Sequence, residues 1–184
     1  MVLAADDVQK ARGVWEKFYV NAEDNGAIVL SRMFKEHPHT LSYFTNFKEL
    51  QSTAGTASVI ELEGLSEVRT HGKKVLSALN DMVQQVDNMD ALKAIIEPLG
   101  KKHAVELKVD VKEFEILCTI LLELMVEKCG EDAKTDFKKV TDVVCEQIKS
   151  TILLELMVEK CGEDAKTDFK KVTDVVCEQI KSTY

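Results

Sequence analysis

The sequence predicts an all-α fold from its composition, its few helix-breaking residues and its apolar spacing. Aliphatic residues, Ala and Met dominate the apolar share, and aromatic residues make up only 6% of the 184 residues. The chain holds 2 prolines and 8 glycines, too few for the many turns of an all-β fold. Apolar residues recur at three- and four-residue steps over most of the length, which is the spacing of one helix face. At this length one compact domain is expected.

The first two helices are predicted from charge at their starts and apolar spacing along them. Asp6 and Asp7 place negative charge where the backbone dipole of a helix favours it. Apolar residues follow at helical steps as far as Phe18. A second helix is expected over residues 27–35. Pro38 limits it and suits the first turn of a short following segment, because proline lacks a backbone N–H.

The middle of the chain predicts a loop followed by a long helix. Residues 48–63 lose the helical pattern, so we expect a loop with one short helix there. A long helix is expected over residues 65–86, with Val68, His71 and Val75 on one face.

The second half predicts three more helices. They are expected over residues 91–103, where Pro98 lies near the end, over residues 110–128, and over residues 133–150. Gly130 separates the last two. Together, these segments predict seven or eight helices in one domain.

The C-terminal part of the chain is a repeat without a single change. Residues 119–150 recur at 151–182, and two such copies do not make a stacking array. The lack of divergence fits a very recent duplication, and more readily an assembly or gene-model error or an artefact. No Gly or Pro occurs between residues 133 and 160, so the last helix is expected to run on into the second copy.

Only one of the two copies can fill the single place that the fold has for it. We therefore expect a domain of residues 1–150 and an appendage of residues 151–184, an extra C-terminal helical hairpin that carries no chemistry. The surplus hairpin exposes its apolar stripe, covers another groove or exchanges with a second chain.

Charge and hydropathy exclude several functions. The formal net charge of −8 argues against a nucleic-acid or anionic-membrane binder, because both need a basic surface. No apolar run approaches the roughly 20 residues that span a bilayer. Acidic residues precede any apolar run at the N-terminus, unlike in a signal peptide. We expect a cytoplasmic protein. Its five cysteines form no CxxC pair and are odd in number, so we expect reduced thiols.

Four histidines are present, and two of them lie in informative places. His37 and His39 flank Pro38 and are expected to face solvent without a functional role. His71 lies on the buried face of a helix, and His103 closes a short helix after a proline. Taken singly, each of these is more often a core histidine than a ligand.

Three stretches of the chain resemble the vertebrate-type globins, and the cytoglobins among them most closely. The first helices of that family resemble VWEKFYVNAEDNGAIVLSRMFKEHPHTLSYFTNFKEL, which includes Trp15, the Pro38 turn and the paired Phe44 and Phe47. Its distal-histidine and proximal-histidine helices resemble RTHGKKVLSALNDMV and AIIEPLGKKHAVELKV. The resemblance covers residues 1–150. It implies a globin fold, in which seven to eight helices surround a haem pocket.

The family's roles, carried over to the matching positions, put haem b (iron protoporphyrin IX) between two histidines. The resemblance implies that His103 is the proximal ligand and binds the iron through one ring nitrogen. Its other ring N–H then needs an acceptor, and helix carbonyls near Leu99 are the candidates. The resemblance also implies that His71 stands opposite the iron as the distal residue.

Further pocket residues are implied in the same way. Phe44 is implied as an aromatic contact of the porphyrin, and Leu30 and Val75 as residues that shape the distal side. The residues implied on the proximal side are Leu99, Leu107 and Val109. The candidates for contact with the haem propionates are Lys74 and Lys102, with Asn46 where a basic residue is common.

Two spacings depart from those of myoglobins. The stretch from Phe47 to His71 is several residues longer, which leaves room for the distal helix to move. The separation of His71 from His103 is also longer and is typical of cytoglobins. Members of that branch often let the distal histidine bind the iron when no gas is present. The resemblance therefore leaves His71 open as a sixth ligand.

The resemblance implies reversible binding of O2 and other diatomic gases such as NO and CO, for storage, transport or sensing. The alternative is a haem-dependent nitric oxide dioxygenase or weak peroxidase, which would rely on an external reductase. A third interpretation needs no haem and makes the chain a helical interaction module with two structural histidines. The sequence leaves open whether the protein is a monomer or a homodimer.

Overall fold

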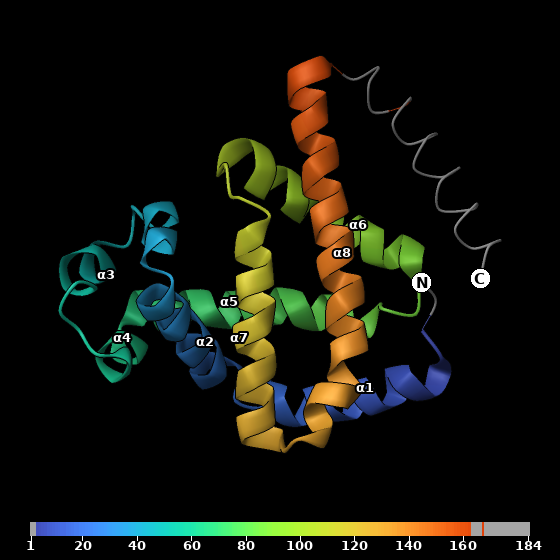
Figure 1. Ribbon diagram of the computed structural model, residues 1–184, viewed down its shortest axis with the longest axis horizontal. Helices are drawn as coiled ribbons and strands as arrows, with labels where there is room; N and C mark the ends of the chain where they lie inside the picture. The colour runs from blue at the N-terminus through green and yellow to red at the C-terminus, as the bar shows by residue number, and fades with distance from the viewer. Residues whose placement is uncertain (1–2, 163–166, 168–184) are drawn as a thin grey trace.

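The computed structural model describes residues 3–162 and residue 167, and all regular structure in this part of the chain is helical (Figure 1). The expected all-α fold is therefore confirmed. The elements in chain order are α1 Ala5–Tyr19, α2 Ala22–Glu36, η1 Pro38–Tyr43, α3 Lys48–Thr53, α4 Val59–Gly64, α5 Ser66–Gln84, α6 Met89–Lys101, η2 Lys102–Glu106, α7 Lys112–Cys129 and α8 Asp132–Cys161. None of these described helices combines the length and the apolar character that a bilayer crossing needs.

Two predictions for the part of the chain before α5 were wrong, and both errors have a local cause. The second helix begins at Ala22, five residues before the predicted start at residue 27. Acidic side chains in its first turn favour this start, and the Asn25 amide donates to the Phe18 carbonyl at 2.7 Å. The expected loop over residues 48–63 contains two short helices. The second of them begins with a capping box, in which Ser58 and Glu61 each accept the other's backbone N–H.

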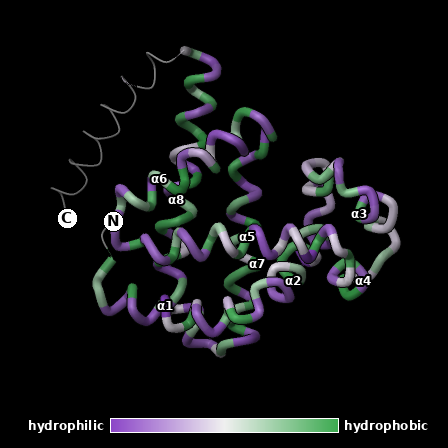
Figure 2. Tube along the Cα trace, turned by 180° about the vertical axis from the view of Figure 1, so that it is seen from behind, coloured by the Kyte–Doolittle hydropathy of each residue, from purple (hydrophilic) through white to green (hydrophobic). Residues whose placement is uncertain are grey.

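The core gathers the inward faces of α1, α2, α5, α7 and α8. Hydrophobic and hydrophilic positions alternate along these helices, as amphipathic helices require (Figure 2). Trp15 of α1 stacks on Phe137 of α8 with ring centroids 5.3 Å apart, and its indole N–H donates to Asn80 of α5 at 3.0 Å. These contacts join the N-terminal helix to α5 and to the first copy of the repeat.

α2 and α5 cross with their backbones in contact. A Cβ atom at Gly26 would overlap the backbone of Gly72, and a Cβ atom at Gly72 would overlap that of Gly26. Glycine at both positions therefore permits the close approach. The crossing brings Leu30 of α2 and His71 of α5 to the same side of the fold.

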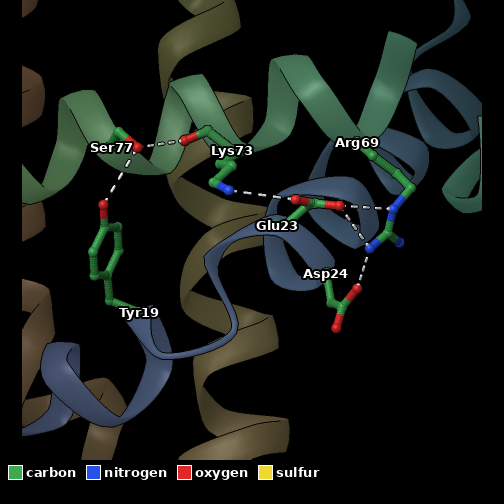
Figure 3. A network of polar contacts seen from close by, with 6 residues as sticks. All are labelled: Tyr19, Glu23, Asp24, Arg69, Lys73 and Ser77. Carbon is green, nitrogen blue, oxygen red and sulfur yellow. Dashed lines mark hydrogen bonds and ion pairs between the residues drawn. The ribbon is translucent and has the colours of Figure 1, made fainter. Parts of the chain in front are cut away.

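A polar network fixes the same two helices on their solvent side (Figure 3). Arg69 of α5 donates from two nitrogens to a Glu23 oxygen at 3.2 and 3.1 Å, and it also pairs with Asp24. Lys73 lies 3.5 Å from the second Glu23 oxygen. Because Arg69 precedes His71 by two residues, the network holds the part of α5 that carries this histidine.

α8 crosses the junction of the two copies as one unbroken helix, which confirms the predicted continuation. The first copy packs in the core, and Ile152, the second residue of the second copy, is fully buried as well. Lys108, in the corner after η2, pairs with Glu159 of α8. The division of the chain at residue 150 stays a prediction. Apart from residue 167, the second half of the expected hairpin lies outside the described residues.

The expectation of reduced thiols was wrong for two of the cysteines. Cys118 of α7 and Cys145 of α8 form a disulfide, and both are buried. The two helices run antiparallel, so residues 27 positions apart in sequence lie opposite each other. A missing CxxC pair excludes only a local pairing, not this one. Cys129 and Cys161 are free, and Cys177 lies outside the described residues.

Candidate functional site

A cavity of about 300 Å³ lies between the elements that the two informative histidines occupy. Its walls come from α2, the end of η1 and the segment after it, α5, η2, the following corner and α7. The lining residues are Leu30, Met33, Tyr43, Phe44, Asn46, Phe47, His71, Val75, Lys102, His103, Leu107, Val109, Glu113, Phe114 and Leu117. A second hollow, of about 340 Å³, lies beside the α7–α8 turn, but Glu123, Glu127 and Glu131 line it and no histidine does. The first cavity is therefore the candidate site.

His103 is held by its own backbone neighbourhood. The predicted helix ends at Lys101, two residues early, and His103 lies in the π-helical turn η2, where the Leu107 N–H donates to the Lys102 carbonyl at 3.0 Å. Such wide turns are rare and occur frequently at functional sites. The Nδ1 of His103 lies 2.8 Å from the Leu99 carbonyl, which is the acceptor that we expected. Since this contact requires a proton on Nδ1, Nε2 keeps its lone pair free to bind a metal.

Phe114 of α7 lies against His103 from the other side. The two ring centroids are 5.3 Å apart and the ring planes are inclined by 71°. The imidazole is therefore fixed by one hydrogen bond and one aromatic contact, which restricts its rotation.

Among the residues that the structure describes, His71 is held by aromatic rings and not by a hydrogen bond to the backbone. Its ring centroid lies 5.2 Å from that of Phe44 and 5.5 Å from that of Phe47, with ring planes inclined by 85° and 79°. Burial, together with the positive charge of Lys74 and the proximity of His103, holds the pKa of His71 below its usual range. The imidazole is therefore neutral near pH 7 and can offer one N–H and one lone pair.

The corner after η2 turns sharply. Lys108 adopts a left-handed conformation with φ of 53°, which costs a non-glycine residue about 1–2 kcal/mol. This turn brings both Leu107 and Val109 to the cavity wall, and the Val109 N–H donates to the His103 carbonyl at 2.9 Å. Two apolar residues thus follow the histidine on the same wall.

The structure brings together most, but not all, of the residues singled out in the sequence. The residues that line the cavity as expected are Leu30, Phe44, His71, Val75, His103, Leu107 and Val109, with Asn46 and Lys102 among the polar ones. Leu99 is not in the wall, although its carbonyl supports His103, and Lys74 is not in it either.

Sequence reasoning missed several wall residues on α2, in η1 and the segment after it, and on α7. They are Met33, Tyr43, Phe47, Glu113, Phe114 and Leu117. Phe114 and Leu117 are three residues apart in a predicted helix close after His103, and this spacing could have identified them. Glu113 gave no such signal. It is a buried carboxylate, and each of its oxygens lies 3.1 Å from Nε2 of His39, which is exposed as expected.

The donor set and the walls fit a flat, largely apolar cofactor that carries a metal. Two imidazoles from different helices line one cavity, and most of the other wall residues are aromatic or aliphatic. Tyr43, Asn46 and Lys102 add polar groups that suit acidic substituents on such a cofactor. The residues present therefore fit a haem.

Comparison with known proteins agrees with this chemistry. The family model described as Globin matches residues 27–148, a range that contains every wall residue of the cavity. The chain is 35% identical to Cytoglobin-1 of Oryzias latipes over 113 residues, which is 61% of this chain and 60% of that protein. It is 35% identical to Cytoglobin-1 of Danio rerio over 125 residues, 68% of each chain. It is also 35% identical to Hemoglobin larval subunit beta-1 of Xenopus laevis over 128 residues, 70% of this chain and 80% of that subunit.

Proposed function

Because the chain belongs to the globin family, we propose that it holds haem b in this cavity and reversibly binds O2 and other diatomic gases there. The observation that carries the proposal is the pair of imidazoles, His71 and His103, on the wall of one largely apolar cavity. When bound through a proximal histidine, ferrous haem supplies reversible coordination of a small gas molecule.

His103 is the proximal ligand in this proposal. Its Nδ1–H donates to the Leu99 carbonyl, which fixes the tautomer and would leave Nε2 free to hold the iron. The hydrogen bond also makes the imidazole more electron-rich, since the carbonyl oxygen stabilises positive charge on the ring. Phe114 keeps the ring plane in place.

His71 is the distal residue. Its neutral ring donates one N–H toward a gas molecule in the cavity, and a hydrogen bond to a partly charged acceptor contributes about 1.5–3 kcal/mol. Phe44 and Phe47 hold the ring in position, while Leu30 and Val75 keep the distal side apolar and limit the entry of water. Through the lone pair of its neutral ring, His71 could also bind the iron as a sixth ligand when no gas is bound.

Gas cycling of the haem-loaded protein tests the proposal. We expect the visible spectrum of the ferrous protein to change on addition of O2 and to return under argon, over repeated cycles. Rapid NO consumption sustained by a cellular reductant, with slow release of O2, would favour the alternative, nitric oxide dioxygenase activity with an external reductase. An unchanged spectrum under O2 would contradict gas binding. The cytoplasmic location and the oligomeric state stay predictions.

A further inference from the structure

The first residues of the second copy pack in the core. α8 continues past residue 150 and lies beside α6 and η2 (Figure 1). Ile152 is fully buried, and it belongs to the same apolar cluster as Ala104 of η2. Leu156, one helical turn further on, packs against this cluster as well. The start of the second copy therefore lies behind the segment that carries His103.

α8 and α6 are in close contact at Thr151 and Gly100. A Cβ atom at Gly100 would lie 2.6 Å from Cγ2 of Thr151 and 3.1 Å from its Cβ. Threonine is stiff about χ1, so its methyl group could not turn away easily, and glycine permits the approach. Gly100 directly follows Leu99, whose carbonyl accepts the hydrogen bond from His103. The second copy thus contacts α6 one residue from the group that orients His103.

An ion pair joins α8 to the other end of η2. Glu159 of α8 pairs with Lys108, in the corner after η2, and Leu107 and Val109 on either side of Lys108 line the cavity. Both charged side chains are exposed, so the pair by itself adds little stability. The contacts of Thr151 and Glu159 are about 12 Å apart along α8, and η2 lies between their two partners in the sequence.

η2 depends on packing for its conformation. It has five residues, and a helical turn of this length is unstable in water by itself. Its buried residue is Ala104, next to His103. Because η2 packs on α8, a change in α8 at this level would let η2 move and would displace His103 from its place in the cavity wall.

We propose that residues 151–159 position the proximal histidine by holding η2 and the residues on both sides of it in place. The proposal rests on the proposed function, because bound haem gives the position of His103 its role. Thr151, Ile152 and Leu156 are positioning residues, since none of them lines the cavity. The second copy then contributes to the haem site through the packing of its first residues.

Hydrogen exchange of the full chain, as purified and after haem loading, tests the packing. Ile152→Ala shortens a buried side chain, so we expect amide exchange in residues 99–109 to accelerate roughly 10- to 100-fold relative to exchange in α1. The first copy supplies a matched control, because Ile120 of α7 is the counterpart of Ile152 and is also buried. Ile120→Ala should destabilise the protein without a selective effect on residues 99–109.

A double substitution tests the contact at Gly100. Gly100→Ala places a methyl group against Thr151, so exchange in residues 99–109 should accelerate, although alanine favours a helix more than glycine does. Thr151→Ser removes Cγ2 and keeps the hydroxyl, which donates to the Gln147 carbonyl at 2.9 Å. We expect Thr151→Ser to restore part of the protection that Gly100→Ala removes, because the two sites are in contact.

The iron–histidine stretching band, recorded after photolysis of the ferrous CO complex, gives a readout that lower stability alone would not shift. Movement of η2 should weaken the hydrogen bond from Nδ1 of His103 and make the imidazole less electron-rich. We therefore expect the band to move to lower frequency in Ile152→Ala and to stay in place in Ile120→Ala.

Several results would overturn the proposal. Equal acceleration of exchange in residues 99–109 by Ile152→Ala and Ile120→Ala would do so, and so would a lack of rescue by Thr151→Ser. An unshifted iron–histidine band in Ile152→Ala, despite faster exchange in residues 99–109, would also contradict it. Failure of the unaltered chain to take up haem would contradict the proposed function instead, and selective exchange in Ile152→Ala would then still support the packing of η2 on α8.

Discussion

The two histidines of the cavity are held in different ways. His103 is fixed by a hydrogen bond from its own ring to the Leu99 carbonyl, and its protonation state at Nδ1 follows from that contact. His71 lies between Phe44 and Phe47, and burial keeps it neutral. The first arrangement suits a permanent bond to a metal, because the ring cannot turn away. The second suits a group that approaches or leaves a ligand, because ring contacts fix direction less strictly than a hydrogen bond does.

Substitution of the two histidines should have the largest effects, and the loss of haem affinity should differ between them. His103→Ala removes the proposed bond to the iron. Loss of a mere supporting hydrogen-bond partner weakens metal binding about 10–100-fold, so we expect a larger fall in haem affinity here. His71→Ala should leave most of the affinity. Haem transfer to apomyoglobin measures both, with His37→Ala as a matched control away from the cavity, and equal losses in the two cavity variants would contradict the assigned roles.

His71→Leu should change the rate of O2 dissociation and not the affinity for haem. Removing the proposed hydrogen bond of about 1.5–3 kcal/mol should speed O2 dissociation roughly 10- to 100-fold. Stopped-flow mixing with CO measures this rate. His71→Gln keeps a donor and should restore part of the slow dissociation. If His71→Leu and His71→Gln release O2 at the rate of the unaltered protein, no distal hydrogen bond exists.

Substitution of the aromatic neighbours of the two histidines should have smaller effects on haem retention and on gas release. Phe114 contacts only His103, and Phe47 contacts His71, among the ring pairs of the described residues. An aromatic pair of this kind contributes about 0.5–1.5 kcal/mol. Phe114→Leu should therefore lower haem retention roughly 2- to 10-fold with little effect on gas release. Phe47→Leu should do the reverse, and the same two assays distinguish them.

The ion pair between α2 and α7 should have the smallest effect, and this effect is on the free energy of unfolding. Arg32 of α2 donates to both oxygens of Glu127 of α7 at 2.7 and 2.6 Å, and this bond holds the pKa of Glu127 below its usual range. A lowered carboxyl pKa stabilises the fold at pH above the unfolded value of about 4.5, and this stabilisation is lost as the pH falls through the folded value.

Glu127→Gln should remove that pH-dependent contribution. Because the Glu127 side chain is 51% exposed, we expect no more than about 1 kcal/mol of unfolding free energy at neutral pH. Urea unfolding at pH 7 and pH 4 measures the change, with the exposed Glu123→Gln on the same helix as the control. A difference that persists unchanged at low pH would not come from this carboxylate.

Most of the fold was predictable because long amphipathic helices show a regular spacing of apolar residues in the sequence. The spacing of apolar residues identified α1, α5 and α7 closely. Only one short helix was expected where α3 and α4 lie, because many residues of this stretch favour turns, although Ser58 and Glu61 have the pattern of a capping box. Of the site, both histidines and the Leu99 carbonyl were predicted. Glu113 was not predicted, because the residues around it in sequence do not indicate that it contacts His39, 74 residues away.

The repeat shows the limit of local sequence most directly. Leu121 is 2% exposed in α7, and its counterpart Leu153 is 51% exposed in α8. Glu155 is buried in α8, whereas its counterpart Glu123 is exposed in α7. The two segments have the same residues and the same helical structure, so packing partners alone decide which face is covered. Helix formation follows from such a sequence, but the direction of its faces does not.

Titration of the full-length protein with haemin, followed in the Soret region, shows whether the cavity takes up haem. We expect a sharp endpoint at one haemin per chain and an absorption band typical of histidine-ligated iron. A solution that shows only the broad spectrum of free haemin at every ratio would contradict it, because two imidazoles on one apolar cavity would then serve no cofactor.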